Sequence, residues 1–172
     1  MKEGNIMGLF SKLFGSKSEA INPNHIYAPM AGEAVAITEV PDPTFAEGMM
    51  GNGIAIKPTS GKVCAPFNGT VDMMFETGHA VSLVSDSGIE LLIHVGLETV
   101  GLNGAPFKVR VQNGQKVKKG DVLMEADLDA IKAAGLPTIT PVLVCNTDDY
   151  PTFNTTIGKS VTNEDVVIEL AK

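Results

Sequence analysis

The sequence predicts an all-β fold: an antiparallel β-sandwich or barrel-like single domain with one or two short helical segments and a flexible N-terminal tail. The chain has 172 residues, a length that suits one domain with a sizeable core. Its 18 glycines and 10 prolines favour many turns and short strands over long helices. From residue 25 onward, strand-like runs and turn residues alternate at close spacing, which favours antiparallel pairing of neighbouring strands.

The first 24 residues differ in charge from the rest of the chain. Three lysines and two glutamates give them a net charge of +1, and the remaining residues carry −8. Apolar residues at positions 6, 9, 10, 13 and 14 form the one-sided stripe of a short amphipathic helix. We therefore divide the chain into a tail, residues 1–24, and a domain, residues 25–172. The tail is either a disordered leader or a helix that binds weakly to a membrane surface.

Nine segments of the domain have the composition of β-strands. Each contains β-branched residues, an apolar–polar alternation or a bounded apolar run, and turn-forming residues separate them. The domain is therefore expected to contain about nine strands or more. The segments are residues 53–57, 62–65, 70–75, 80–85, 90–95, 108–111, 122–126, 140–145 and 166–170.

One helix is expected between the seventh and eighth of these strands. Asp127 is a suitable N-cap, and Leu128 and Ile131 follow it at helical spacing. Gly135 and Pro137 then end the helix. The domain therefore carries a small helical element on a β body.

A short internal repeat supports the same fold class. Residues 28–35 (APMAGEAV) and 65–71 (APFNGTV) each contain a proline in an extended segment, then a glycine turn and the start of a strand. Proline suits the first residue of a strand or a sheet edge. The repeat indicates a pseudo-repeated sandwich or barrel.

Charge and composition exclude several classes of function. A net charge of −7, with no Lys/Arg run longer than two residues, is unlike the basic surface that binds nucleic acid. No apolar run approaches the roughly 18 residues that span a bilayer. Cys64 and Cys145 lie far apart, so neither a disulfide framework nor a CxxC metal site is expected. Reduced thiols in a cytoplasmic protein are the expectation.

Two of the three histidines lie in surroundings suited to a functional site. His25 has no acidic or nucleophilic residue arranged around it, and we interpret it as a packing or surface residue. In the strand predicted at 90–95, alternation places His94 and Gly96 on the same face. The glycine removes a side chain beside the imidazole and leaves room for an anion or a partner. His79 begins another predicted strand, so the two histidines can converge.

Several motifs resemble those of one protein family in order and spacing. They are FETGHA at 75–80, SDSGIELLIHVGLETV at 85–100, VPD at 40–42, MGNGIAIKP at 50–58 and ITPV at 139–142. On these motifs the sequence is identified as a member of the enzyme IIA component, glucose family, of the bacterial phosphoenolpyruvate-dependent sugar phosphotransferase system. The resemblance covers nearly all of residues 26–170. Residues 7–13 are also similar to the amphipathic leader of free-standing members.

The resemblance implies a β-sandwich with a shallow apolar depression around the two histidines. His94 would accept a phosphoryl group from the phosphocarrier protein HPr and donate it to a cysteine of a sugar-specific IIB domain. His79 would stabilise the phosphoryl group, and Thr77 would orient His79 through a hydrogen bond. The family needs no cofactor, but the resemblance implies that His79 and His94 can bind zinc together with a partner's carboxylate. Some relatives also bind regulated permeases or kinases.

The chemistry of these residue types agrees with a phosphoryl relay. A neutral imidazole is nucleophilic near pH 7, and its phosphoramidate bond stays reactive enough for onward transfer. Phosphoryl transfer needs placement in line and neutralisation of charge on the phosphoryl oxygens, which a second imidazole and backbone N–H groups can supply.

Two positions depart from the family pattern. The family usually has aspartate where this chain has Glu98, which is longer by one methylene. Pro106 lies where many members have a flexible glycine, and proline restricts that turn. These departures bear on loop contacts and on the choice of partner more than on chemistry.

Two other functions remain as alternatives. A zinc hydrolase could use His79, His94 and Glu98 as ligands, although the sequence has no HExxH motif and no further convincing ligand. A lipoyl or biotinyl carrier is favoured by residues 113–123, which resemble the hairpin near a carrier lysine. No Met-Lys or Asp-Lys dipeptide at a tight turn follows that segment.

Overall fold

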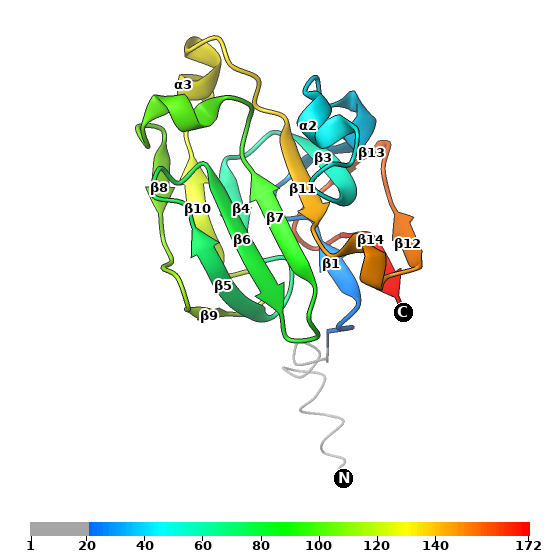
Figure 1. Cartoon of the computed structure of the whole chain (residues 1–172). Helices are drawn as coiled ribbons and strands as arrows, with labels where there is room; N and C mark the ends of the chain where they lie inside the picture. The colour runs from blue at the N-terminus through cyan, green and yellow to red at the C-terminus, as the bar shows by residue number, and fades with distance from the viewer. Residues whose placement is uncertain (1–20) are drawn as a thin grey trace, which may run out of the picture.

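The computed structural model describes residues 21–172, and the amphipathic stripe predicted at positions 6–14 lies outside them. Within the described residues the fold is mostly β, with two short α-helices, α2 (Pro43–Ala46) and α3 (Leu128–Ala133), and 3-10 turns η2 (Ile37–Glu39), η3 (Thr99–Leu102) and η4 (Thr147–Asp149) (Figure 1). The strands are β1 (His25–Tyr27), β2 (Gly32–Ala36), β3 (Asn52–Pro58), β4 (Lys62–Cys64), β5 (Gly69–Met74), β6 (Ala80–Ser85), β7 (Glu90–His94), β8 (Phe107–Val109), β9 (Lys116–Val117), β10 (Val122–Ala126), β11 (Thr140–Val144), β12 (Thr152–Thr155), β13 (Lys159–Val161) and β14 (Val166–Ala171).

The strands form one large sheet and two small ones. The large sheet has the order β13-β2-β3-β11-β7-β6-β5-β9, and the small sheets have the orders β1-β14-β12 and β4-β10-β8. Every strand pair is antiparallel. This confirms the predicted antiparallel sandwich.

The central strands of the large sheet are buried on both faces. In β7, Leu91 and Ile93 belong to the main core, whereas Leu92 belongs to a second cluster on the opposite face. Phe45 of α2 and Leu143 of β11 lie in the same second cluster. Alternate residues of a strand point to opposite faces, so this second face is the one that carries His94.

The internal repeat seen in the sequence is also present in the backbone. The proline of each segment accepts a hydrogen bond from the residue just before the other segment: Tyr27 N donates to Pro66 O (3.0 Å) and Cys64 N donates to Pro29 O (2.8 Å). The glycines of the two segments occupy equivalent places: Gly32 pairs with Val161 of β13, and Gly69 pairs with Val117 of β9. The two segments therefore enter their strands in similar ways, and the pseudo-repeat stays an interpretation.

The segment that resembles a carrier hairpin contains a turn that occurs twice in the structure. Asp121 Oδ2 accepts from Lys118 N at 2.8 Å, and Asp165 Oδ2 accepts from Thr162 N at 2.8 Å, so two equivalent turns join β9 to β10 and β13 to β14. In this chain the segment 113–123 is not a β-hairpin, because β9 and β10 lie in different sheets.

Local signals account for the two α-helices. Asp127 Oδ1 accepts from Ala130 N at 3.0 Å and caps α3, as predicted. Helix α2 was not predicted, although Asp42 and Pro43 form a start signal of the same kind. Asp42 Oδ1 accepts from Thr44 N at 3.0 Å, and Pro43 occupies the first helical turn.

The structure contains no helix within residues 21–172 that is long and apolar enough to cross a membrane. Cys64 is buried and Cys145 is exposed, and both are free thiols, in agreement with the prediction from their spacing.

Candidate functional site

His94 lies at the end of β7 with its imidazole partly exposed on the second face of the large sheet. The ring of Phe45 from α2 packs beside it, with ring centroids 5.0 Å apart and an interplanar angle of 53°. Phe45 is the buried residue of the short helix that Asp42 caps. The phenyl ring therefore forms an apolar wall on one side of the imidazole.

His79 precedes β6 and brings a second imidazole to the first. The β6–β7 register pairs Ala80 with His94, and Val95 N donates to His79 O at 2.7 Å. The two imidazole centroids are 5.1 Å apart and their planes meet at 77°. His79 is 6% exposed, and Phe75 packs edge-on against it with centroids 5.3 Å apart. The convergence expected from the sequence is therefore present.

The Nδ1 atom of each imidazole is held by a neighbour two residues away in the sequence. His94 Nδ1 donates to Gly96 O at 2.8 Å. A carbonyl oxygen only accepts, so Nδ1 carries the proton and Nε2 of the neutral ring keeps its lone pair. His79 Nδ1 contacts Thr77 Oγ1, and the hydroxyl can act as donor or acceptor there.

Both imidazoles favour the neutral form. Burial lowers the pKa of His79 below 6.5, and the neighbouring His94 lowers it further. Burial also lowers the pKa of His94, while the hydrogen bond to Gly96 and the carboxylates of Asp42 and Glu98 oppose that shift. The partly exposed ring therefore presents an unprotonated Nε2 near pH 7.

The negative charges of two acidic residues act on the pKa of His94. Asp42 lies at the start of α2, and exposed Glu98 lies just before η3 with a left-handed φ of 64°. Neither Asp42 nor Phe45 was identified by reasoning from single residues, because α2 is far from the histidines in sequence. The Asp42–Pro43 start signal could have located the helix but not the strand face on which it packs.

His25 is not part of this site. It lies in β1, paired with Glu169 of β14 in one of the small sheets. No cluster of three or more His, Cys, Asp or Glu side chains placed to hold a metal ion is found among residues 21–172. The described part of the chain thus lacks the set of three ligands that the hydrolase alternative requires.

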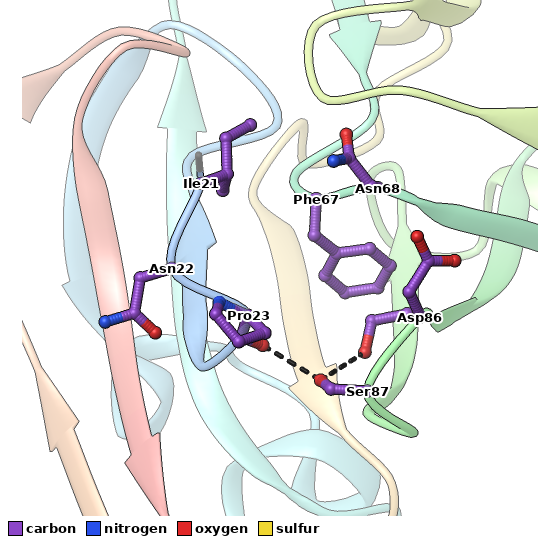
Figure 2. A pocket seen from close by; sticks show the side chains of 8 residues that line it. Ile21, Asn22, Pro23, Phe67, Asn68, Asp86 and Ser87 are labelled. Atoms are coloured by element: carbon purple, nitrogen blue, oxygen red, sulfur yellow. Dashed lines mark hydrogen bonds between the residues drawn. The ribbon is translucent and has the colours of Figure 1, made fainter. Parts of the chain in front are cut away.

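A separate cavity of about 190 Å³ is lined by residues at the end of β6 opposite to His79. Figure 2 shows the side chains that line it. Phe67, Asn68 and Asp86 line it, and Ser87 Oγ donates to Pro23 O at 2.9 Å across one side. Ser85, the last residue of β6, also contributes through a hydroxyl 3.0 Å from that of Ser87. None of the groups around the two imidazoles takes part in this cavity.

Known families and solved structures include relatives of this chain. The family described as phosphoenolpyruvate-dependent sugar phosphotransferase system, EIIA 1, matches residues 24–150, a region that contains both clustered histidines. Among solved structures, the chain is similar to the glucose permease IIA from Mycoplasma capricolum, with 34% sequence identity and a TM-score of 0.79. That match covers 84% of this chain and 93% of the other.

Proposed function

Because the chain belongs to the EIIA 1 family of the phosphoenolpyruvate-dependent sugar phosphotransferase system, and is thus a phosphocarrier in sugar uptake, we propose that His94 is the residue that carries the phosphoryl group. The observation that supports this role is the hydrogen bond from His94 Nδ1 to Gly96 O. It leaves Nε2 as the nucleophilic nitrogen, and Nε2 belongs to the more exposed of the two imidazoles.

The proposed partners are the phosphocarrier protein HPr as donor and a cysteine of a IIB domain as acceptor. His94 Nε2 attacks the phosphorus of phospho-HPr, a new P–N bond forms, and the P–N bond to the imidazole of HPr breaks. In the second step a thiolate of the IIB domain attacks the same phosphorus, and His94 leaves as a neutral imidazole. Nδ1 keeps its proton and its hydrogen bond to Gly96 O throughout. The phosphorylated ring therefore carries a positive charge, which is lost when the P–N bond breaks and neutral His94 leaves, so neither step requires a proton transfer at His94.

His79 is proposed to stabilise the phosphoryl oxygens. It can do so only when its Nε2 carries the proton, which requires that Nδ1 accept the hydrogen bond from Thr77 Oγ1. In this arrangement Thr77 selects the tautomer of His79, as Gly96 selects that of His94. A protonated Nε2 donates to an oxygen whose charge grows in the transition state.

Zinc binding by the histidine pair is a further part of the proposal. Both Nδ1 atoms are already engaged, so each ring would offer Nε2 to the ion, with Thr77 then accepting from His79 Nδ1. Two imidazoles leave a tetrahedral ion without a full set of protein ligands, and a partner's carboxylate would complete it. The ion would strengthen a complex between proteins and has no part in phosphoryl transfer.

The proposed location is the cytoplasm, where a IIB domain and HPr are accessible. An apolar wall of Phe45 and Phe75 beside the two imidazoles suits docking of partner proteins, including regulated permeases or kinases.

A reconstituted transfer assay tests these roles. The chain is mixed with phosphoenolpyruvate and the upstream proteins, acceptance is read by intact mass, and donation is read as transfer to a IIB domain. His94→Ala should abolish acceptance. His79→Gln should still accept but should donate about 10²–10³-fold more slowly, the usual effect of losing one stabilising donor.

His25→Ala is the matched control, because His25 lies in another sheet and should leave both steps unchanged. Normal donation by His79→Gln would refute the stabilising role, and acceptance by His94→Ala would refute the proposal as a whole.

A further inference from the structure

The peptide unit between Gly96 and Leu97 is held from both sides. Its carbonyl oxygen accepts from His94 Nδ1 at 2.8 Å, and its N–H donates to Pro137 O at 3.1 Å. The two groups belong to one planar amide and point in opposite directions. An anchor on the N–H side therefore determines where the carbonyl points, and with it the orientation of the imidazole.

The side chain of Thr99 also contacts this loop. Its side chain is fully buried, and Oγ1 donates to Val95 O at 2.6 Å, which closes the loop 95–99 on itself. Its methyl group lies against Gly96, where an added Cβ would be 2.8 Å from Thr99 Cγ2 and 2.8 Å from Pro137 O. The Gly96 backbone is thus enclosed between Thr99 and Pro137.

This enclosure maintains a backbone that a free loop would not favour. Gly96 has a φ of 75°, and Glu98, which is not a glycine, has a φ of 64°. Left-handed conformations of non-glycine residues persist where surrounding contacts enforce them. Gly96 and Glu98 both lie between Val95 and Thr99. The hydrogen bond from the Thr99 hydroxyl to Val95 O therefore closes the segment that contains both left-handed residues.

We propose that Thr99 is a positioning residue for phosphoryl transfer, and that together with the Pro137 carbonyl it holds the Gly96 carbonyl against His94 Nδ1. Its effect on transfer rests on the proposed function of His94, whereas its effect on the imidazole does not. The hydroxyl does not touch the imidazole. It holds the Val95 carbonyl, and the Val95–Gly96 backbone connects that carbonyl to the Gly96 carbonyl, which accepts from His94 Nδ1.

Two substitutions separate the hydroxyl from the methyl group. Thr99→Val keeps the shape and removes the hydroxyl, and Thr99→Ser keeps the hydroxyl and removes the methyl. ¹⁵N NMR of the unphosphorylated chain should show His94 as a single Nδ1–H tautomer in the wild type and in Thr99→Ser. Thr99→Val should show a mixture of tautomers.

The transfer kinetics should follow the tautomer. Thr99→Val should accept the phosphoryl group about tenfold more slowly at saturating phospho-HPr, with little change in KM, because docking is intact and placement is not. Thr99→Ser should recover most of that rate.

Thr147→Val is the matched control for a purely structural effect. Thr147 Oγ1 also donates to a backbone carbonyl, that of Val144, but at the opposite end of β11 from the histidines. This variant should lose stability without any change in the tautomer of His94.

Three outcomes would overturn the proposal. The first is a Thr99→Val variant that loses stability as Thr147→Val does and keeps the wild-type tautomer and rate. The second, which needs no variant, is the absence in the wild type of a through-hydrogen-bond coupling between Leu97 N–H and the Pro137 carbonyl. The third is a mixture of His94 tautomers in the wild-type chain. A wild-type chain that has the single tautomer but takes no phosphoryl group on His94 would instead refute the proposed function.

Discussion

At the scale of single residues, the state of the two imidazoles follows from burial and from what each Nδ1 contacts. Burial disfavours the charged form, and a proton on Nδ1 leaves the lone pair on Nε2. A phosphoryl acceptor needs both conditions at physiological pH. His94 meets both, and the residue is partly exposed to solvent.

The first prediction at this scale concerns pH. NMR titration should place the midpoints of His79 and His94 below 6.5, because burial lowers the pKa of each. The unfolded chain then binds more protons than the folded chain below about pH 6.5, so the free energy of unfolding should decrease as the pH falls through that window. A midpoint above 6.5 for either ring would contradict the description of the site.

A second residue prediction concerns Gly96. Gly96→Ala places a side chain in a left-handed conformation and brings its Cβ to 2.8 Å from a carbonyl oxygen. Gly114→Ala has a similar φ of 84° and open space around the new Cβ. In urea unfolding, Gly114→Ala should cost about 1 kcal/mol and Gly96→Ala about 2–4 kcal/mol. Equal losses would show that the enclosure around Gly96 is loose.

At the scale of elements, the site is a strand hairpin covered by a short helix. The hairpin β6–β7 brings His79 and His94 together, and α2 adds Phe45 and the charge of Asp42. Burial lowers the pKa of His94, and the negative charge of Asp42 partly offsets that lowering. The helix therefore affects both the shape and the protonation of the site.

The element prediction separates these two effects at Asp42. Asp42→Asn keeps a capping oxygen and removes the charge, whereas Asp42→Ala removes both. Both variants should lower the pKa of His94 in an NMR titration. Only Asp42→Ala should also lose stability, by about 1 kcal/mol in chemical unfolding. An unchanged pKa of His94 in both variants would show that Asp42 does not act on the imidazole.

The same elements show what reasoning from sequence can predict. β6 and β10 have the predicted bounds because turn residues flank an alternating pattern on both sides. The approach of His79 to His94 also follows from local information, since a hairpin centred on Ser87 pairs Ala80 with His94. Strands as short as β1 and β9 carry too little pattern to be recognised.

Contacts between distant segments were beyond such reasoning. Phe45 reaches His94 only because α2 packs on the second face of the large sheet, and Pro137 reaches Leu97 only through the connection from α3 to β11. No local propensity encodes either approach. For this reason the motifs identified the two histidines and Thr77, while the contacts from Phe45 and Pro137 emerged from the fold.

At the scale of the whole molecule, a repeated β framework carries one site on one face of its large sheet. The two repeats supply matching strands and turns, but the histidine pair lies in the β6–β7 hairpin alone. The central strands are buried on both faces, so the backbone beneath the imidazoles is rigid. A rigid platform suits the phosphocarrier role of the family to which the chain belongs.

The identity of the phosphorylated atom is the decisive measurement. The chain, labelled with ¹⁵N-histidine, is phosphorylated through phospho-HPr and examined by heteronuclear NMR for the nitrogen bonded to phosphorus. The structure predicts that phosphorus is bonded to Nε2 of His94, while Nδ1 keeps its proton and donates it in a hydrogen bond to Gly96 O. A phosphoryl group on His79, or on Nδ1 of His94, would contradict it.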